Sequence, residues 1–171
     1  MKLSVMIYSF SRTLLSRQMS LPEVLKIISR LGVEGVDISS HLMMGMKPLE
    51  LYSIMRNLGL QAICYIVNAD FVHVERKERE KATEVVKYGL DTCVELKSPL
   101  MMIVTGVTKK GIDIQTARHN VIEGLNKCVP VGQSAGIKEG FPKKKKGPKT
   151  NFVFGRFPQK NEQCEKREEM L

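Results

Sequence analysis

The 171-residue sequence predicts an α/β fold of about four parallel βα units, because one helix-to-strand joint recurs along its first 137 residues. In RLGVEGVDI (30–38), NLGLQAICYIV (57–67) and ELKSPLMMIVTG (95–106), a leucine next to a small or polar residue is followed almost at once by an apolar run. Gly32 and Gly59 suit the left-handed conformation that follows many helices. Strands joined through helices in this way lie parallel in one sheet, with right-handed crossovers.

The predicted strands are the apolar runs at 2–8, 35–38, 61–67 and 100–106. Three of the four are nearly continuous in apolar residues, as expected for parallel strands covered on both faces.

Amphipathic segments between these runs predict four helices. The first begins at the capping box Ser20-Leu21-Pro22-Glu23, the second near Pro48, and the third spans about 76–96. A fourth runs from Asp113 toward Cys128, and Pro130 should end or kink it. The inward-facing stripes of the first and third helices are expected to include Val24, Leu25, Ile27, Ile28, Leu31, Ala82, Val85, Val86, Leu90, Cys93 and Val94.

The alternation stops after the fourth helix. A fifth buried strand should follow QSAGI (133–137), but the sequence continues KEGFPKKKKGPK, whose charges and prolines cannot occupy such a strand. Residues 1–137 hold 17 basic and 13 acidic residues, a net charge of +4, whereas residues 138–171 hold 10 and 5, a net charge of +5. The sequence therefore predicts a folded domain over 1–137 and an irregular, basic, disordered tail over 138–171.

The ordered series LPEVLKIISRLGVEGVDI, NLGLQAICYIVNADF, LMMIVTG and ARHNVIEGL resembles the first half of the xylose isomerase-like TIM barrel family, proteins labelled sugar phosphate isomerases/epimerases. The resemblance covers residues 1–137, four of the eight βα units of such a barrel. It implies a partial (β/α) TIM-type barrel, a sugar or sugar phosphate partner, and metal-assisted proton transfer that isomerises or epimerises the sugar.

In the full-length family the resemblance implies a divalent metal: Mn, Co or Mg. One glutamate ligand follows an AGI-type joint, and an aspartate, a histidine and another glutamate come from later strands. Glu139 lies near the first of these positions but is embedded in the lysine-rich segment, and residues 151–171 contain no histidine or aspartate. We therefore expect a truncated or frameshifted product, or a natural half-barrel, that binds no metal and is inactive. No catalytic residue can be assigned.

Ligands of such barrels bind at the C-terminal ends of the strands, which makes the polar residues there the candidate substrate-binding residues. By resemblance, an aromatic residue at the first strand and a carboxylate at the second contact sugar hydroxyls. Structural alternatives stay open: a core role for Tyr8, turn caps for Asn68 and Asp70, and a helix cap or solvated loop for Asp37. All three histidines, His41, His73 and His119, are also expected to be exposed or loosely packed. The candidates are Tyr8 and Ser9, Asp37 and His41, Asn68 and Asp70, and Thr105.

Other features favour a cytoplasmic protein. Cys64, Cys93, Cys128 and Cys164 show no metal-ligand spacing and are expected to be free thiols. No apolar run is long enough to span a membrane. Unpaired sheet edges and an uncovered inner face predict self-association. An alternative function from another class is nonspecific binding of single-stranded nucleic acid by the lysine run and the aromatic residues of FVFGRF, which is the less favoured hypothesis.

Overall fold

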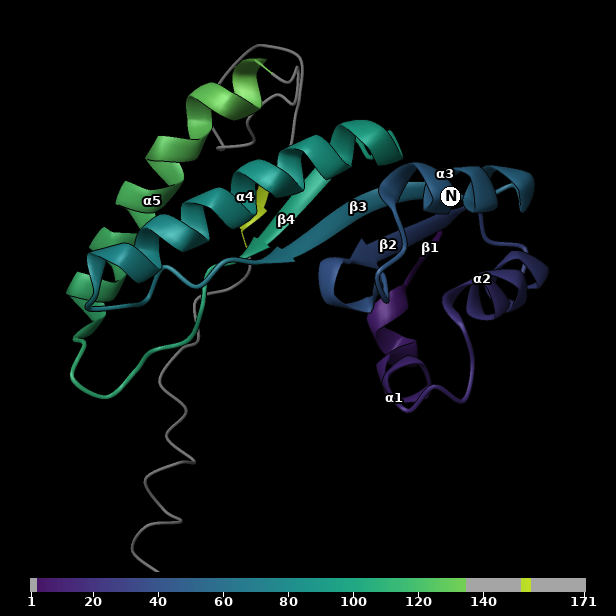
Figure 1. Ribbon diagram of the computed structural model, residues 1–171, viewed down its shortest axis with the longest axis horizontal. Helices are drawn as coiled ribbons and strands as arrows, with labels where there is room; N and C mark the ends of the chain where they lie inside the picture. The colour runs from purple at the N-terminus through teal and green to yellow at the C-terminus, as the bar shows by residue number, and fades with distance from the viewer. Residues whose placement is uncertain (1–2, 135–151, 155–171) are drawn as a thin grey trace, which may run out of the picture.

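A parallel sheet lies at the centre of the computed structural model, which describes residues 3–134 and 152–154 (Figure 1). Neighbouring strands are all parallel, and their order across the sheet is their order along the chain. The predicted α/β fold, an open part of a TIM-type barrel with sequential βα units, is confirmed. The strands are β1 (Ser4–Met6), β2 (Gly35–Ser39), β3 (Gln61–Asn68), β4 (Leu100–Val104) and β5 (Phe152–Phe154).

The short strand β5 was not predicted. It comes from the segment expected to be an irregular tail, and it pairs with β4 in the position that a fifth strand of the sheet would take. Phenylalanine and valine favour strands, and β4 would otherwise present unpaired backbone groups along this edge. The rest of the predicted tail, including the lysine run at 143–146 and Glu139, lies outside the described residues, as does Cys164.

The four predicted helices form, and three short elements that were not predicted follow the ends of β1 and β2. Helix α5 runs past Pro130 to Ser134, so this proline does not end the helix. The three short elements are the 3₁₀ helices η1 (Ile7–Phe10) and η2 (Ser40–Leu42) and the α-helix α1 (Ser11–Leu15). The four predicted helices are α2 (Leu21–Arg30), α3 (Pro48–Asn57), α4 (Arg76–Leu96) and α5 (Ile114–Ser134).

Each of the three repeated joints places one residue in the left-handed conformation. The φ angles are 73° at Gly32 and 71° at Gly59, as predicted. At the third joint the same conformation is taken by Lys97, with φ 53°, directly after α4. The local turn is thus the same at all three joints although glycine occupies only two of them.

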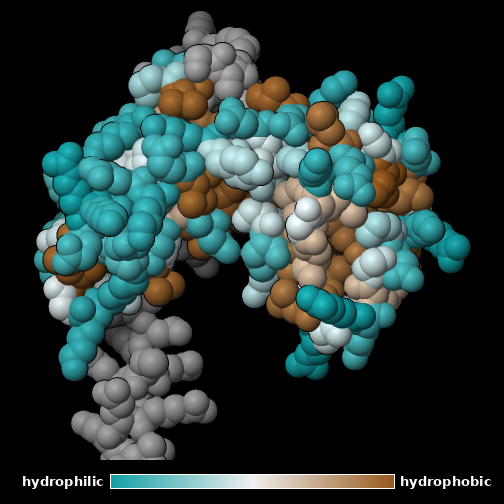
Figure 2. All heavy atoms as spheres, in the orientation of Figure 1, coloured by the Kyte–Doolittle hydropathy of each residue, from teal (hydrophilic) through white to brown (hydrophobic). Residues whose placement is uncertain are grey.

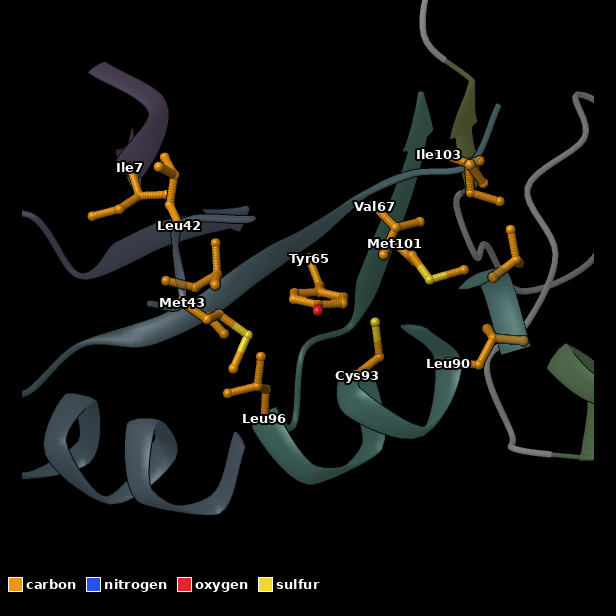
Figure 3. Packing of buried hydrophobic residues seen from close by; sticks show 14 of the residues in the cluster. Ile7, Leu42, Met43, Tyr65, Val67, Leu90, Cys93, Leu96, Met101 and Ile103 are labelled. Atoms are coloured by element: carbon orange, nitrogen blue, oxygen red, sulfur yellow. The ribbon is translucent and has the colours of Figure 1, made fainter. Parts of the chain in front are cut away.

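One face of the sheet packs against the helices. Side chains alternate along a strand, and Ile38, Tyr65 and Met101 occupy paired positions in β2, β3 and β4 with at most 2% of their surface exposed. Helices α3 and α4 pack against β3, and α5 packs against α4. Figure 3 shows Tyr65 directed from the sheet toward Cys93 of α4. Three residues expected to face inward are instead exposed, because they lie toward the solvent edges of their helices: Leu31, Val85 and Val94.

The opposite face of the sheet, here called the inner face, carries the alternate residues. Met6, Asp37, Cys64 and Leu100 form one row of paired positions across β1 to β4. Figure 2 shows the molecule hollowed on the side of the sheet opposite α4, whereas hydrophilic residues cover α4 and α5. In a complete barrel this face would point toward the barrel axis.

A register shift between β2 and β3 sets this row. Val36 pairs with Ala62 but Asp37 pairs with Cys64, which leaves Ile63 as an extra, bulged residue. A Cβ atom on Gly35 would lie 2.5 Å from Cγ1 of Ile63, so the bulge requires glycine at this position.

Candidate functional site

The C-terminal ends of β1 to β4 meet at one edge of the sheet, because the strands are parallel, and polar residues follow each end. The exposed Tyr8 and Ser9 lie in η1, His41 lies in η2, Asn68 is the last residue of β3, Asp70 lies two residues further on, and Thr105 directly follows β4. The structure therefore places six of the seven predicted candidates beyond or at a strand end.

Tyr8 and His41 are in contact. Their ring centroids lie 5.9 Å apart with an interplanar angle of 66°, an edge-to-face arrangement. The Nδ1 atom of His41 lies 3.0 Å from Oγ of Ser39, which is buried and holds the imidazole ring. Tyr8 is 56% exposed, so the alternative that it is a core aromatic residue is wrong. Ser39 was not predicted, because nothing in a serine at a strand end distinguishes it from an ordinary turn residue.

Asp37 lies inside β2 rather than at its C-terminal end, so the helix-cap and loop alternatives are wrong. The strand extends to Ser39 and places the Asp37 carboxylate on the inner face. Oγ of Ser4 in β1 lies 3.2 Å from both carboxylate oxygens and can donate to either. Burial raises the pKa of Asp37, and the hydrogen bond from Ser4 opposes this shift.

Cys64 is the neighbour of Asp37 in β3. Burial raises the pKa of its thiol to about 11, and the negative charge of Asp37 adds to this shift. Neither group lies in an environment that favours its charged form, which distinguishes this pair from an activated nucleophile.

Asp70 joins the loops after β3 and β4. Its Oδ1 accepts a hydrogen bond of 3.0 Å from the backbone N–H of Val72, so the alternative of a turn cap is confirmed. Its Oδ2 also accepts a 2.5 Å hydrogen bond from Nζ of Lys109, which lies 2.5 Å from Nε2 of His73. Lys109 was missed in the sequence because it lies 39 residues from Asp70 in an irregular loop.

The backbone fixes this cluster to the sheet. The N–H of Ala69 donates to the carbonyl of Val104 over 2.9 Å, and the N–H of Phe71 donates to that of Thr105 over 3.0 Å. Gly106 has φ 102°, and a side chain there would overlap the Asp70 carboxylate. The two loops are therefore held together immediately beyond β3 and β4.

The donors at this edge do not fit a divalent metal. Within residues 3–134 and 152–154, no three His, Cys, Asp or Glu side chains are grouped closely enough to hold an ion. Asp70 and His73 lie 3.4 Å apart, but the ammonium group of Lys109 contacts both and takes the place that a cation would need.

No helix in the described part of the chain is both long and apolar enough to span a membrane.

Comparison with known proteins assigns the fold to a family. Residues 25–141 match the family described as xylose isomerase-like TIM barrel. A search of curated proteins found no match. The solved structures that share the fold include the IolI protein with a bound zinc atom (14% identity, TM-score 0.66), a sugar phosphate isomerase/epimerase from Parabacteroides distasonis (17%, 0.62) and D-psicose 3-epimerase in the presence of D-fructose (14%, 0.62).

The match covers 81%, 80% and 80% of this chain, but 50%, 49% and 50% of the three solved structures. The chain therefore spans about half the length of these proteins, which agrees with its four sequential βα units. Since the family match extends over more than half of the chain, this protein belongs to the xylose isomerase-like TIM barrel family.

Proposed function

We propose that this protein binds a sugar or sugar phosphate at the C-terminal edge of its sheet, as part of a site of the sugar isomerase/epimerase type. The observation that carries this proposal is the collection of polar side chains from four successive strands at one edge. The names of two solved relatives, a sugar phosphate isomerase/epimerase and D-psicose 3-epimerase with D-fructose, support the substrate class.

The side chains at this edge suit a carbohydrate. A sugar hydroxyl both donates and accepts hydrogen bonds, and carboxylates such as those of Asp37 and Asp70 accept them. The exposed ring of Tyr8, with its edge contact to His41, offers a flat apolar surface for the C–H face of a sugar ring. Lys109 supplies a cation that suits a phosphate group, provided that the phosphate displaces one of its two present partners.

We further propose that the 171-residue chain alone does not catalyse isomerisation or epimerisation of the bound sugar. Reactions of this kind move a proton next to a carbonyl, and a divalent metal polarises the carbonyl when it is bound. The described residues hold no set of three metal ligands, and a loosely held ion activates substrate poorly.

Binding can be tested by saturation-transfer NMR on the full chain with D-fructose and D-fructose 6-phosphate. Asp37→Ala should weaken sugar binding by about tenfold, the effect of losing a charge-assisted hydrogen bond. Asp91→Ala changes an exposed aspartate on α4 and is the matched control, which should bind as the unchanged protein does. Absence of any transfer to either sugar, or equal binding by both variants, would contradict the proposed site.

Activity can be tested separately with manganese, cobalt, magnesium and zinc across a panel of aldoses and ketoses. We expect no turnover in any combination. Metal-dependent turnover that Glu139→Ala abolishes would show that the segment after residue 137 supplies a working ligand, and the proposal of an inactive chain would then be wrong.

The proposal includes a cytoplasmic location. Its support is that Cys64, Cys93 and Cys128 are free thiols, as is common in a reducing compartment.

A further inference from the structure

A pocket of about 550 Å³ lies at the opposite, N-terminal edge of the sheet, between the ends of α3 and α4 and the starts of β3 and β4. The buried side chains of Met55, Leu60 and Leu96 contribute to its apolar floor. Arg56 and Lys97, which are both exposed, bring two positive charges to its rim. We propose that this pocket binds a small organic anion with an apolar body and one carboxylate or phosphate group.

The charged side chains that line the pocket are all positive. Arg56 and Lys97 are its charged lining residues, and none of the lining residues is acidic. In the described part of the chain neither cation forms an ion pair with a carboxylate. Nζ of Lys97 instead lies 4.9 Å from the centre of the Tyr52 ring. Two cations beside an apolar cavity, both without a carboxylate partner, favour an anionic ligand.

The backbone at Lys97 supports this inference independently. The other two helix-to-strand joints use Gly32 and Gly59 in the left-handed conformation, which costs glycine little and a side-chain-bearing residue more. A lysine in the last turn of α4 would interact with the helix dipole equally well without this strain. Helix stability therefore does not explain a lysine at this position, and strained residues of this kind concentrate at binding sites.

The dimensions and the lining define the ligand class. The volume lies within the range of small-molecule sites, which combine apolar walls with a few polar groups. The guanidinium group of Arg56 can bind a carboxylate or phosphate through two parallel hydrogen bonds, and Lys97 can donate to the same group. Tyr52, together with the buried leucines, offers an apolar surface for an aromatic or branched body. The site lies at the far edge of the sheet from Asp37 and Asp70, so it does not depend on the proposed sugar function.

The test uses the full chain and three probes of similar shape: benzoate, phenyl phosphate and the neutral benzamide. Backbone amide NMR titrations should show saturable shifts at the ends of α3 and α4 with benzoate or phenyl phosphate, and much weaker binding of benzamide. Which of the two anions binds more tightly distinguishes a carboxylate site from a phosphate site.

The decisive variant is Lys97→Gly, which removes the charge and restores the residue that the other two joints use. It should weaken anion binding by about tenfold, while the melting temperature stays the same or rises because backbone strain is relieved. Lys81→Gln, at an exposed position of α4 outside the pocket, should leave binding unchanged. The proposal is overturned if neither anion binds, if benzamide binds as tightly as the anions, or if Lys97→Gly binds them like the unchanged protein.

Discussion

Asp37 and Cys64 are neighbours on the inner face of the sheet, and the charge of Asp37 makes the ionisation of Cys64 less favourable. Burial raises the pKa of both groups, and the charge of Asp37 raises that of Cys64 further. At neutral pH the Cys64 thiol is therefore almost entirely protonated. A half-buried cysteine in this environment should react slowly despite its partial exposure.

This coupling predicts the effect of Asp37→Asn on thiol reactivity. Removing the negative charge lowers the pKa of Cys64, so alkylation by iodoacetamide should become faster at every pH between 8 and about 9.5, where the thiolate fraction rises about tenfold per unit. Burial still holds the pKa above its ordinary value of 9.0. Peptide mass mapping would follow Cys64 apart from the other cysteines. Asp91→Asn is the control, and an equal rate in both variants would contradict the coupling.

The residues at the C-terminal edge differ in how far the sequence could predict them. Tyr8, His41, Asn68 and Thr105 were found because each follows an apolar run, and parallel strands bring such positions together. Lys109 and His73 were not found, because their contact depends on how two irregular loops fold against each other. Asp37 was identified as a residue at the C-terminal end of its strand, because the predicted strand stopped at Ile38, whereas β2 continues to Ser39.

At the scale of elements, α2 is stabilised by a local arrangement that the sequence predicts completely. The backbone N–H of Ser20 donates to Oε2 of Glu23 over 2.7 Å, and the N–H of Glu23 donates to Oγ of Ser20 over 3.4 Å. The pKa of Glu23 is lowered first by the bond from the Ser20 backbone N–H and next by the Ser20 hydroxyl, which also donates to Oε2 over 2.7 Å. The stabilisation is therefore present above the ordinary Glu pKa of 4.5 and is lost as the pH falls through the lowered value.

Ser20→Ala should lower the free energy of unfolding by about 1 kcal/mol at pH 7. Urea denaturation would measure the change, and the difference from the unchanged protein should shrink as the pH falls through the lowered pKa of Glu23. Ser53 is exposed on α3, and its hydroxyl donates a hydrogen bond to the Leu49 carbonyl one turn earlier in the same helix. Ser53→Ala should therefore change the free energy of unfolding little. A loss of similar size for Ser53→Ala would show that the cap is not the cause.

Helix α5 lies against the loop after β3 through Gly124 and Phe71. A Cβ atom on Gly124 would overlap the ring of Phe71, which is completely buried. Gly124→Ala should therefore destabilise the protein by about 1–3 kcal/mol, although alanine is the better helix former.

A double-mutant cycle tests this contact. In a Phe71→Leu background, Gly124→Ala should cost at least about 1 kcal/mol less than in the unchanged protein, because the smaller side chain leaves room for the methyl group. Strictly additive free energies of unfolding would mean that the ring and the helix do not restrict each other.

On the scale of the whole molecule, the described strands form one sheet whose inner face keeps apolar side chains exposed. Val104 of β4 lies on this face and is 38% exposed, and Met6 of β1 is 41% exposed. Apolar residues exposed in this way favour association between chains.

We expect the weight-average molecular mass, measured by analytical ultracentrifugation, to rise with protein concentration. Val104→Lys should raise the concentration needed for association by at least about tenfold, since a charge cannot be buried unpaired in the contact. Val94→Lys is the matched control, because Val94 is 53% exposed on α4 away from the inner face. A monomer at all concentrations, or equal effects of the two substitutions, would contradict association through this face.

The sequence predicts the order of strands and helices well because each joint is a local signal repeated three times. It predicts β5 poorly, since a three-residue strand far from its partner carries almost no local signal and depends on the open edge of β4.

The bulge at Ile63 makes one residue of the third strand dispensable for strand pairing. Val36 pairs with Ala62 and Asp37 pairs with Cys64, and Ile63 between them has no partner in β2. Loss of that one codon would therefore leave both pairs in place, and the residues on either side of the deletion would keep their faces of the sheet. It would also remove the side chain whose Cγ1 atom would lie 2.5 Å from a Cβ atom on Gly35. In evolution, a third strand shortened at this residue should therefore be accompanied by a weaker requirement for glycine at position 35.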